Sequence, residues 1–288
     1  MWWCAGAWAG QVTVVVSDDV PAYEQPVQAF LDALGQQAEV LRLHGRESEV
    51  PAVSARLAAD PPDAIFAVGA KAGWVVQRAT PTVPLVIAGV RDPERYGLVG
   101  PMVTGVTLSV PPETTLSQFH AFFPEVSAVG VVAPASLSAA REAELVAASE
   151  AVGVGVTVLR VDSPRALRGV LHRARAIEAL WWVPSADLLT STAWRTVLDE
   201  TRRRQLPLLV DTTTLVRAGG TFAVAPDPAA VGQQAAALTQ RILAGDLAAD
   251  LPMEPPGGRL VALHRTALAQ AGWTIDPLLA DFVDVLVH

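Results

Sequence analysis

The sequence predicts an α/β protein made of two Rossmann-like lobes, each with a parallel sheet, joined by a hinge. Three observations lead to this fold class. Short apolar runs rich in β-branched residues alternate with longer amphipathic stretches, which is typical of parallel α/β structure. The strand-like runs are apolar at nearly every position, as expected of strands that helices cover on both faces. One segment rich in Gly and Pro, 91–110, interrupts this alternation, and a second series of the same kind follows it.

The first series starts with the run VTVVV, which predicts a strand at 12–16. Pro21 then begins a helix with apolar residues at helical spacing, and Gly35 ends it. The same alternation continues as far as residue 90. It predicts further strands at 38–43, 64–68 and 85–90, and helices at 21–34, 50–59 and 71–79.

Segment 91–110 contains Asp-Pro and several glycines, so we interpret it as the passage between the lobes, with a strand at 103–108. The second series predicts strands at 128–132, 155–161, 179–183 and 206–210, and helices at 138–152, 164–174 and 191–204. A strand at 221–225, a long helix at 228–244, a Pro/Gly connector at 251–258 and a tail with one strand and short helices follow.

These elements suggest a division of the chain into two lobes. We expect lobe 1 to contain 11–105 and about 226–250, and lobe 2 to contain 106–225 and about 251–288. Residues 1–10 (MWWCAGAWAG) are apolar but too short to cross a bilayer, so we expect a tail or the remnant of a secretory signal and no membrane span. Cys4 is a candidate for a lipid anchor, although bulky tryptophans precede it where such sites have small residues.

The charge balance limits the partners that the protein can bind. With 21 basic and 29 acidic groups the formal net charge is −8, and no basic stripe is evident, so nucleic acid is not an expected partner. Lys71 is the only lysine.

The single cysteine excludes an intramolecular disulfide and a cysteine-built zinc site, and the five histidines show no ligand spacing. No nucleotide, zinc-protease or calcium motif occurs, so we expect neither a cofactor nor a metal.

Open α/β sheets bind ligands beyond the carboxyl ends of their strands, so we expect the site in the loops that follow the strands. The loop Gly69-Ala70-Lys71 opens a helix, and its free amides would suit an anion such as a carboxylate. Asp187 could receive a ligand ammonium group. The aspartates could instead cap the helices that follow them. The expected ligand contacts in these loops are Ser17, Asp18, Gly69, Ala70, Lys71, Asp92, Ser136, Asp187 and Asp211.

Trp181 and Trp182 are neighbours in a predicted strand. Successive side chains of a strand point to opposite faces, so at most one of these two rings faces a given surface. The sequence leaves open whether these rings, and Trp74, belong to the core or to a ligand site.

Several blocks of the sequence resemble the ABC transporter substrate-binding proteins of the tryptophan/tyrosine type, which have the type I periplasmic-binding fold. The blocks occur in the family's order and spacing and cover nearly the whole chain after Gln11. Tyr23 lies in the first of them and joins the expected ligand contacts. The blocks are at 17–34, 63–72, 84–99 and 103–132, followed by WWVPSAD, residues 206–246 and RLVALHRTALAQAGW.

The resemblance implies a receptor without enzymatic activity. Its two lobes would close around a small solute, an amino acid or a related carboxylate, and pass it to an ABC permease and ATPase complex. It also implies a periplasmic or extracellular, membrane-associated location, with no cofactor.

The chain departs from the family at several positions. In the family the loop after the third strand usually reads G-T-x-A and holds a ligand carboxylate. Here Ala70 replaces the threonine, so one hydroxyl donor is lost. Asp92 and Pro93 match the Asp-Pro that the family has after the fourth strand. The family's P-x-D motif after the eighth strand is one residue longer here, and it ends at Asp187. Ser136 is the polar residue left in a loop that is rich in asparagine and serine in the family. The ligand can therefore differ from the aromatic amino acids of other members.

Two other functions fit the same fold class. A sensor or regulator core would use it to report a metabolite without transport. An enzyme such as a racemase or lyase would need an acid/base pair across a cleft, and the lone Cys4 lies outside the predicted elements. The resemblance favours the receptor.

Overall fold

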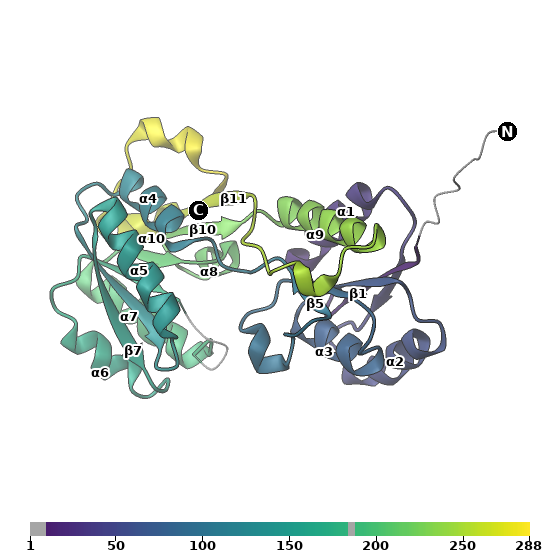
Figure 1. The fold of residues 1–288 in the computed structure, drawn as a ribbon. Coiled ribbons are helices and arrows are strands. Elements are labelled where there is room, and N and C mark those ends of the chain that lie inside the picture. Colours follow the sequence, from purple (N-terminus) through teal and green to yellow (C-terminus); the bar gives the residue numbers. More distant parts are fainter. Residues whose placement is uncertain (1–9, 184–187) are drawn as a thin grey trace. The chain divides into compact units, whose positions relative to one another are not determined.

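The computed structural model of the chain describes residues 10–183 and 188–288. It consists of two compact units (Figure 1). Unit 1 holds the described residues up to Leu108 together with Asp227–Gly258, and unit 2 holds Ser109–Pro226 together with Arg259–His288. Each unit has its own sheet and its own hydrophobic core, so the prediction of two α/β lobes is confirmed.

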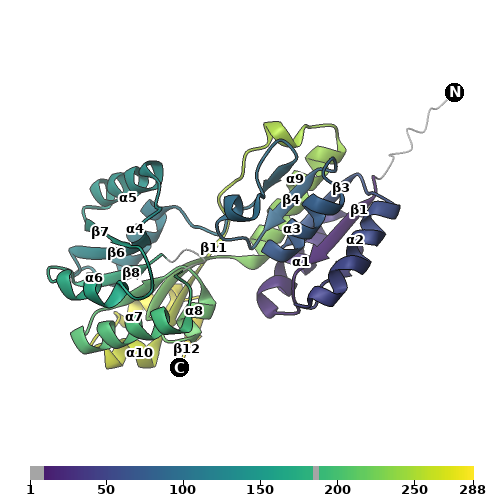
Figure 2. The same ribbon diagram turned by 90° about the horizontal axis from the view of Figure 1, so that it is seen from below.

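Unit 1 contains a five-stranded sheet in the order β2-β1-β3-β4-β5, and every strand pair in it is parallel. All residues of β1, β3 and β4 are buried, because helices cover both faces of the sheet (Figure 2). The strands are β1 (Val12–Val16), β2 (Glu39–Arg42), β3 (Ala64–Val68), β4 (Leu85–Ala88) and β5 (Val103–Gly105).

Four α-helices cover the sheet of unit 1, two on each face (Figure 1). α1 (Pro21–Leu34) packs against α9 (Pro228–Leu243), although the two are far apart in the sequence. α2 (Val50–Ala59) and α3 (Ala70–Ala79) lie side by side on the opposite face. Short 3-10 helices complete the unit: η1 (Glu47–Glu49), η2 (Pro93–Tyr96) and η3 (Ala248–Asp250).

Unit 2 contains a seven-stranded sheet in the order β12-β11-β10-β9-β8-β6-β7. This sheet is mostly parallel, as predicted, but β10 and β11 run antiparallel. β11 enters from the connector that follows α9, so it can pair with the edge of the sheet without a helical crossover. The strands are β6 (Ala128–Pro134), β7 (Gly155–Val161), β8 (Ala179–Trp182), β9 (Leu208–Val210), β10 (Phe222–Pro226), β11 (Arg259–His264) and β12 (Val285–Val287).

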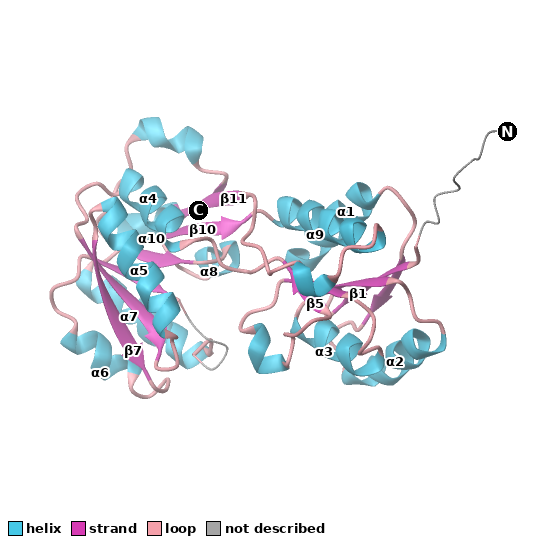
Figure 3. Cartoon of the chain, in the orientation of Figure 1, coloured by secondary structure: helices cyan, strands magenta, loops and turns pink. Residues whose placement is uncertain are grey.

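Helices cover both faces of the sheet in unit 2 as well (Figure 3). α4 (Pro112–Phe122) and α5 (Ala139–Val152) pack on one face. α6 (Leu167–Arg173), α7 (Ser191–Arg204) and α8 (Thr213–Arg217) pack on the other. The tail adds α10 (Arg265–Gln270) and η4 (Pro277–Phe282).

The structure differs from the sequence-based prediction in one helix and in the unit to which one segment belongs. The sequence predicts no helix between 109 and 127, but α4 begins there at Pro112, with Leu116, Phe119 and Phe122 buried at helical spacing. Residues 251–258, expected in lobe 2, lie in unit 1, where the Glu254 amide donates to the Gly105 carbonyl oxygen over 2.9 Å.

Within 10–183 and 188–288, no helix has the length and apolar character that a membrane crossing requires.

Candidate functional site

The loops at the carboxyl ends of the unit 1 strands are joined by hydrogen bonds. The Ser17 amide donates to the Val68 carbonyl (3.0 Å), and the Gly69 amide donates to the Ala88 carbonyl (2.9 Å). The buried Ser17 hydroxyl accepts a hydrogen bond from the Ala72 amide in the first turn of α3 (2.9 Å). The structure therefore brings the predicted residues Ser17 and Gly69 together, and it uses Ser17 to cap a helix amide.

Gly69 occupies a backbone conformation that only glycine adopts readily. Its φ is 89° and its ψ is 157°, a region that side-chain-bearing residues avoid. A Cβ atom there would lie 2.5 Å from the Ser17 Oγ and 3.0 Å from the Tyr23 Cζ. A Cβ at Gly89 would meet the same ring, 3.3 Å from Tyr23 Cε1. The two glycines thus allow the Tyr23 ring to lie against the ends of β3 and β4.

Tyr23 and Asp18 are electrostatically linked in this cluster. Burial, followed by the negative charge of Asp18 and the neighbouring Tyr96, raises the pKa of the Tyr23 phenol above its usual value. The phenol therefore keeps its proton and remains a hydrogen-bond donor at neutral pH. Asp18 Oδ1 accepts from the Asp19 amide over 2.8 Å.

Lys71 has a protein partner at the rim of the cluster. Its ammonium group donates to the Gly45 carbonyl oxygen over 2.8 Å, which ties α3 to the loop after β2. Its neighbour Ala70 supplies no polar side chain. The predicted anion site around Gly69, Ala70 and Lys71 therefore offers backbone amides, while the one charged group is bonded elsewhere.

Three of the aspartates predicted at strand ends, Asp18, Asp92 and Asp211, do not cap the helices that follow them. α1 has Val20 at its N-cap and no side-chain cap, although Asp18 lies two residues before it. Asp92 precedes η2 with φ 53° and makes no side-chain capping bond. The Thr212 hydroxyl caps α8 in place of Asp211. The capping alternative is thus wrong for all three.

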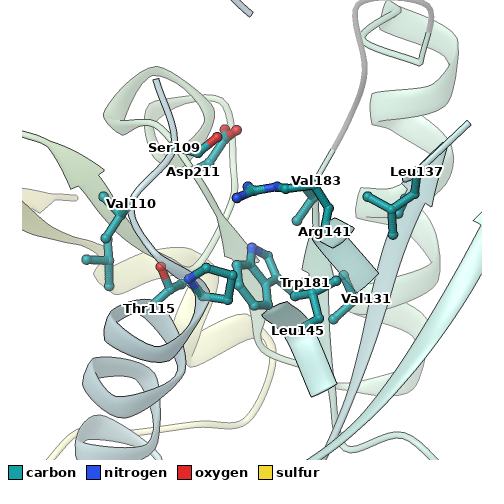
Figure 4. Close-up of a pocket in the computed structure, with 13 residues that line it drawn as sticks. Ser109, Val110, Thr115, Val131, Leu137, Arg141, Leu145, Trp181, Val183 and Asp211 are labelled. Atoms are coloured by element: carbon teal, nitrogen blue, oxygen red, sulfur yellow. The ribbon is translucent and has the colours of Figure 1, made fainter. Parts of the chain in front are cut away.

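Unit 2 contains a pocket at the carboxyl ends of β6, β8 and β9 (Figure 4). Its volume is about 40 Å³. Its wall is mainly aliphatic and includes the Trp181 ring, with Val131 and Ala133 from β6, Leu145 from α5, Val183 just after β8 and Val224 from β10. The polar residues that line it are Ser109, Thr115, Arg141 and Asp211.

Of the predicted lobe 2 residues that the structure describes, Ser136 and Asp211, only Asp211 lines this pocket. Ser136 lies exposed in the turn after β6, while its neighbour Leu137 lines the pocket. Asp187 lies outside the described residues and stays a prediction. Arg141, Thr115 and Ser109 are missed by the sequence reasoning, because helices and linkers gave no signal for a site.

The two neighbouring tryptophans take opposite faces of the sheet, as the strand alternation predicts. Trp181 packs with α4 and α5 and lines the pocket, whereas Trp182 is buried among α6, α7 and α8. Trp74 belongs to neither site, since it is exposed on α3 and stacks with the Arg78 guanidinium. The alternation was therefore the one sequence signal that pointed toward Trp181.

Acidic, histidine and cysteine side chains do not gather into a metal site in the part of the chain that the structure describes. The polar groups at the strand ends of both units are hydroxyls, carboxylates, a guanidinium and amides, which bind solutes by hydrogen bonds and charge.

Comparison with known proteins places this arrangement in a family. The model of the ABC transporter substrate binding protein family matches residues 11–280. No curated protein sequence matches the chain. Solved structures with the same fold include a domain from Streptococcus pneumoniae in complex with L-Trp, with 20% identity, a TM-score of 0.65 and coverage of 96% of this chain and 100% of that one.

Two further structures are similar over most of the chain. A ligand-free, open substrate binding protein with adhesive properties from Clostridium difficile has 17% identity and a TM-score of 0.73, covering 96% of this chain and 99% of the other. A LacI family transcriptional regulator from Bifidobacterium animalis has 12% identity and a TM-score of 0.51, covering 87% and 95%. At these identities the likeness establishes the fold, and the fold class predicted from the sequence is confirmed.

The family match spans both units and nearly all described residues, and it agrees with the resemblance found in the sequence. This chain belongs to the ABC transporter substrate binding protein family.

Proposed function

We propose that the protein is an extracytoplasmic receptor that binds a small solute between its two units and delivers it to an ABC permease and ATPase complex. The observation that carries this proposal is the family match over residues 11–280, which includes the polar strand-end loops of both units. The protein would act by hinge closure, with the ligand shifting the balance from open to closed states. No step of this function requires catalysis.

The solute class that we propose is an amino acid or a related carboxylate. Unit 1 offers the Tyr23 phenol, the Asp18 carboxylate and the amides at the start of α3. Unit 2 offers the Arg141 guanidinium and the Asp211 carboxylate. Because the two units offer both positively and negatively charged groups, they suit a zwitterion better than a sugar, which carries no charge.

A thermal-shift screen tests this proposal. The panel contains amino acids, small carboxylates, sugars and nucleosides, and mass spectrometry identifies any solute that co-purifies. A true ligand at about 100 times its Kd stabilises the folded state by about 2.7 kcal/mol, which raises Tm measurably. We expect a shift with at least one amino acid or carboxylate. The absence of a shift with every solute, or turnover of a bound solute, would contradict the receptor function.

A metabolite sensor is the second candidate, because the fold is shared with a LacI family regulator. Removing the gene in the native host separates the two functions. Loss of uptake of the identified solute supports the receptor. Unchanged uptake with altered transcription in response to that solute supports the sensor.

A further inference from the structure

The pocket of unit 2 contains a buried hydrogen-bond donor for which the described residues supply no acceptor. Trp181 is only 5% exposed, and its indole Nε1 bonds to no group among the described residues. Buried N–H groups are nearly always paired with protein, water or ligand, so an orphan donor beside a cavity indicates where an acceptor binds. Figure 4 shows the indole nitrogen on the ring edge that faces Arg141 and Asp211.

Arg141 supplies a second donor at the same place. It lies in the first turn of α5, and its guanidinium points across the pocket toward Asp211 (Figure 4). Its ion pair with Glu144 uses Nη1 (2.5 Å), and a guanidinium has five N–H donors. Arg141 and Trp181 are both donors, so neither satisfies the other. An oxygen anion between them would accept from both, and such charge-assisted bonds are the strong ones.

The size and the walls of the pocket limit what this anion can be. A volume of about 40 Å³ accommodates a few non-hydrogen atoms, which fits a carboxylate group with its neighbouring carbon. Val131, Leu145 and Val183 line the same space, so apolar side chains would cover one side of the bound group. Asp211 adds negative charge on the neighbouring wall and would attract an ammonium group.

Unit 1 is less suited to hold a carboxylate than the sequence suggests. The Lys71 ammonium donates to the Gly45 carbonyl, and the Ala72 amide donates to the Ser17 hydroxyl. Ala70 has no polar side chain. The one charged group expected to receive the anion is therefore already bonded, as is an amide in the first turn of α3.

The geometry points to Trp181 and Arg141 as the residues that hold the carboxylate of the solute, inside unit 2, with Asp211 facing its ammonium group. This assignment rests on the proposed function and deepens it. The solute is then an α-amino acid whose carboxylate and ammonium groups lie in the unit 2 pocket. Carboxamides and amines that lack the carboxylate are poor ligands.

Two substitutions with matched controls test the assignment. Trp181→Phe removes the indole N–H and keeps an aromatic ring, and Trp182→Phe makes the same change on the opposite face of the sheet. Arg141→Gln removes the guanidinium, and Arg195→Gln removes another exposed guanidinium, on α7. Calorimetry measures the Kd of L-amino acids, each paired with its carboxamide, for all five proteins.

We expect Arg141→Gln to raise the Kd about 10- to 100-fold, as for loss of a hydrogen bond to a charged group, and Trp181→Phe to raise it about tenfold. Both controls should bind as the wild type does. In the wild type, NMR of indole N–H groups should show the Trp181 resonance moving on addition of the amino acid and not of its carboxamide. The NMR result holds even if a variant folds poorly.

The outcomes separate this assignment from the proposed function. If an amino acid binds but its carboxamide binds equally, or if both test variants keep the wild-type Kd, the assignment to Trp181 and Arg141 is wrong and the receptor function stands. The assignment is also wrong if the Trp181 indole N–H resonance does not shift when the amino acid saturates the protein. If no solute of the broad screen binds, the receptor function fails, and the assignment fails with it.

Discussion

At the scale of single residues, the unit 1 cluster depends on the missing side chain of Gly69. This residue adopts φ 89° and ψ 157°, and its position leaves room for the Ser17 hydroxyl and the Tyr23 ring. The Ser17 hydroxyl in turn accepts from the Ala72 amide. One glycine therefore determines both the local backbone and the arrangement of two predicted ligand contacts.

We predict that Gly69→Ala lowers the free energy of unfolding by about 3 kcal/mol, because backbone strain and overpacking each cost about 1–3 kcal/mol. Gly35→Ala is the matched control. Its φ is also positive (73°), but a Cβ there meets nothing within 4 Å, so a loss of only about 1 kcal/mol is expected. Urea unfolding measures both. Equal losses in the two variants would show that contact with Ser17 and Tyr23 does not matter.

At the scale of elements, α1 and α9 approach each other closely through Gly232. A Cβ on this residue would lie 2.2 Å from the Pro26 carbonyl oxygen and 2.9 Å from the Phe30 amide nitrogen. α1 follows β1 at the start of the chain, whereas α9 follows the first segment of unit 2, Ser109–Pro226. Their packing therefore closes the core of unit 1 with a segment from much later in the sequence.

We predict that Gly232→Ala is destabilising by about 1–3 kcal/mol, because the two helices must move apart. The sign of the change in the free energy of unfolding is informative, because Gly→Ala inside a helix ordinarily stabilises a protein by about 1 kcal/mol. Gln233→Ala, at the exposed neighbouring position of α9, should change stability little. Urea unfolding compares the two. A stabilising Gly232→Ala would mean that the close approach of α1 and α9 is not maintained.

At the scale of the whole molecule, the chain passes between the units three times, after Leu108, after Pro226 and after Gly258. The last two passages run side by side. The antiparallel pairing of β10 and β11 extends to the residue pair Pro226 and Arg259. Next to this pair, the Asp227 amide donates to the Gly258 carbonyl oxygen over 3.0 Å. Few residues therefore connect the units, which suits the hinge closure that we propose.

We expect the radius of gyration, measured by small-angle X-ray scattering, to fall when a saturating amino acid ligand closes the units. At a solute concentration about equal to the wild-type Kd, Arg141→Gln should show a much smaller decrease than the wild type, because its Kd is about 10- to 100-fold higher. Arg195→Gln should behave as the wild type does. Binding detected by calorimetry without any decrease in the wild type would contradict hinge closure.

The sequence predicted most of the elements, and some to the residue. The helices at 50–59 and 191–204 and the strands at 12–16, 64–68 and 155–161 have the predicted bounds. It placed Ser17, Gly69 and Asp211 correctly at strand ends, since strand ends follow from local patterns, whereas β4 ends at Ala88, earlier than predicted, so Asp92 lies beyond it. It missed α4, whose start at Pro111 and Pro112 resembles a loop although both prolines fit a helix N-terminus.

By itself, then, the sequence determined the alternation of strands and helices, the family, and the opposite orientation of Trp181 and Trp182, because periodicity and motifs are encoded in neighbouring residues. Only the tertiary structure decided that Lys71 bonds to Gly45, that β11 runs antiparallel to β10, and that the Trp181 indole shares a pocket with Arg141. These features depend on which distant segments pack together. Such packing sets the hydrogen-bond partners and charges that decide where a ligand can bind.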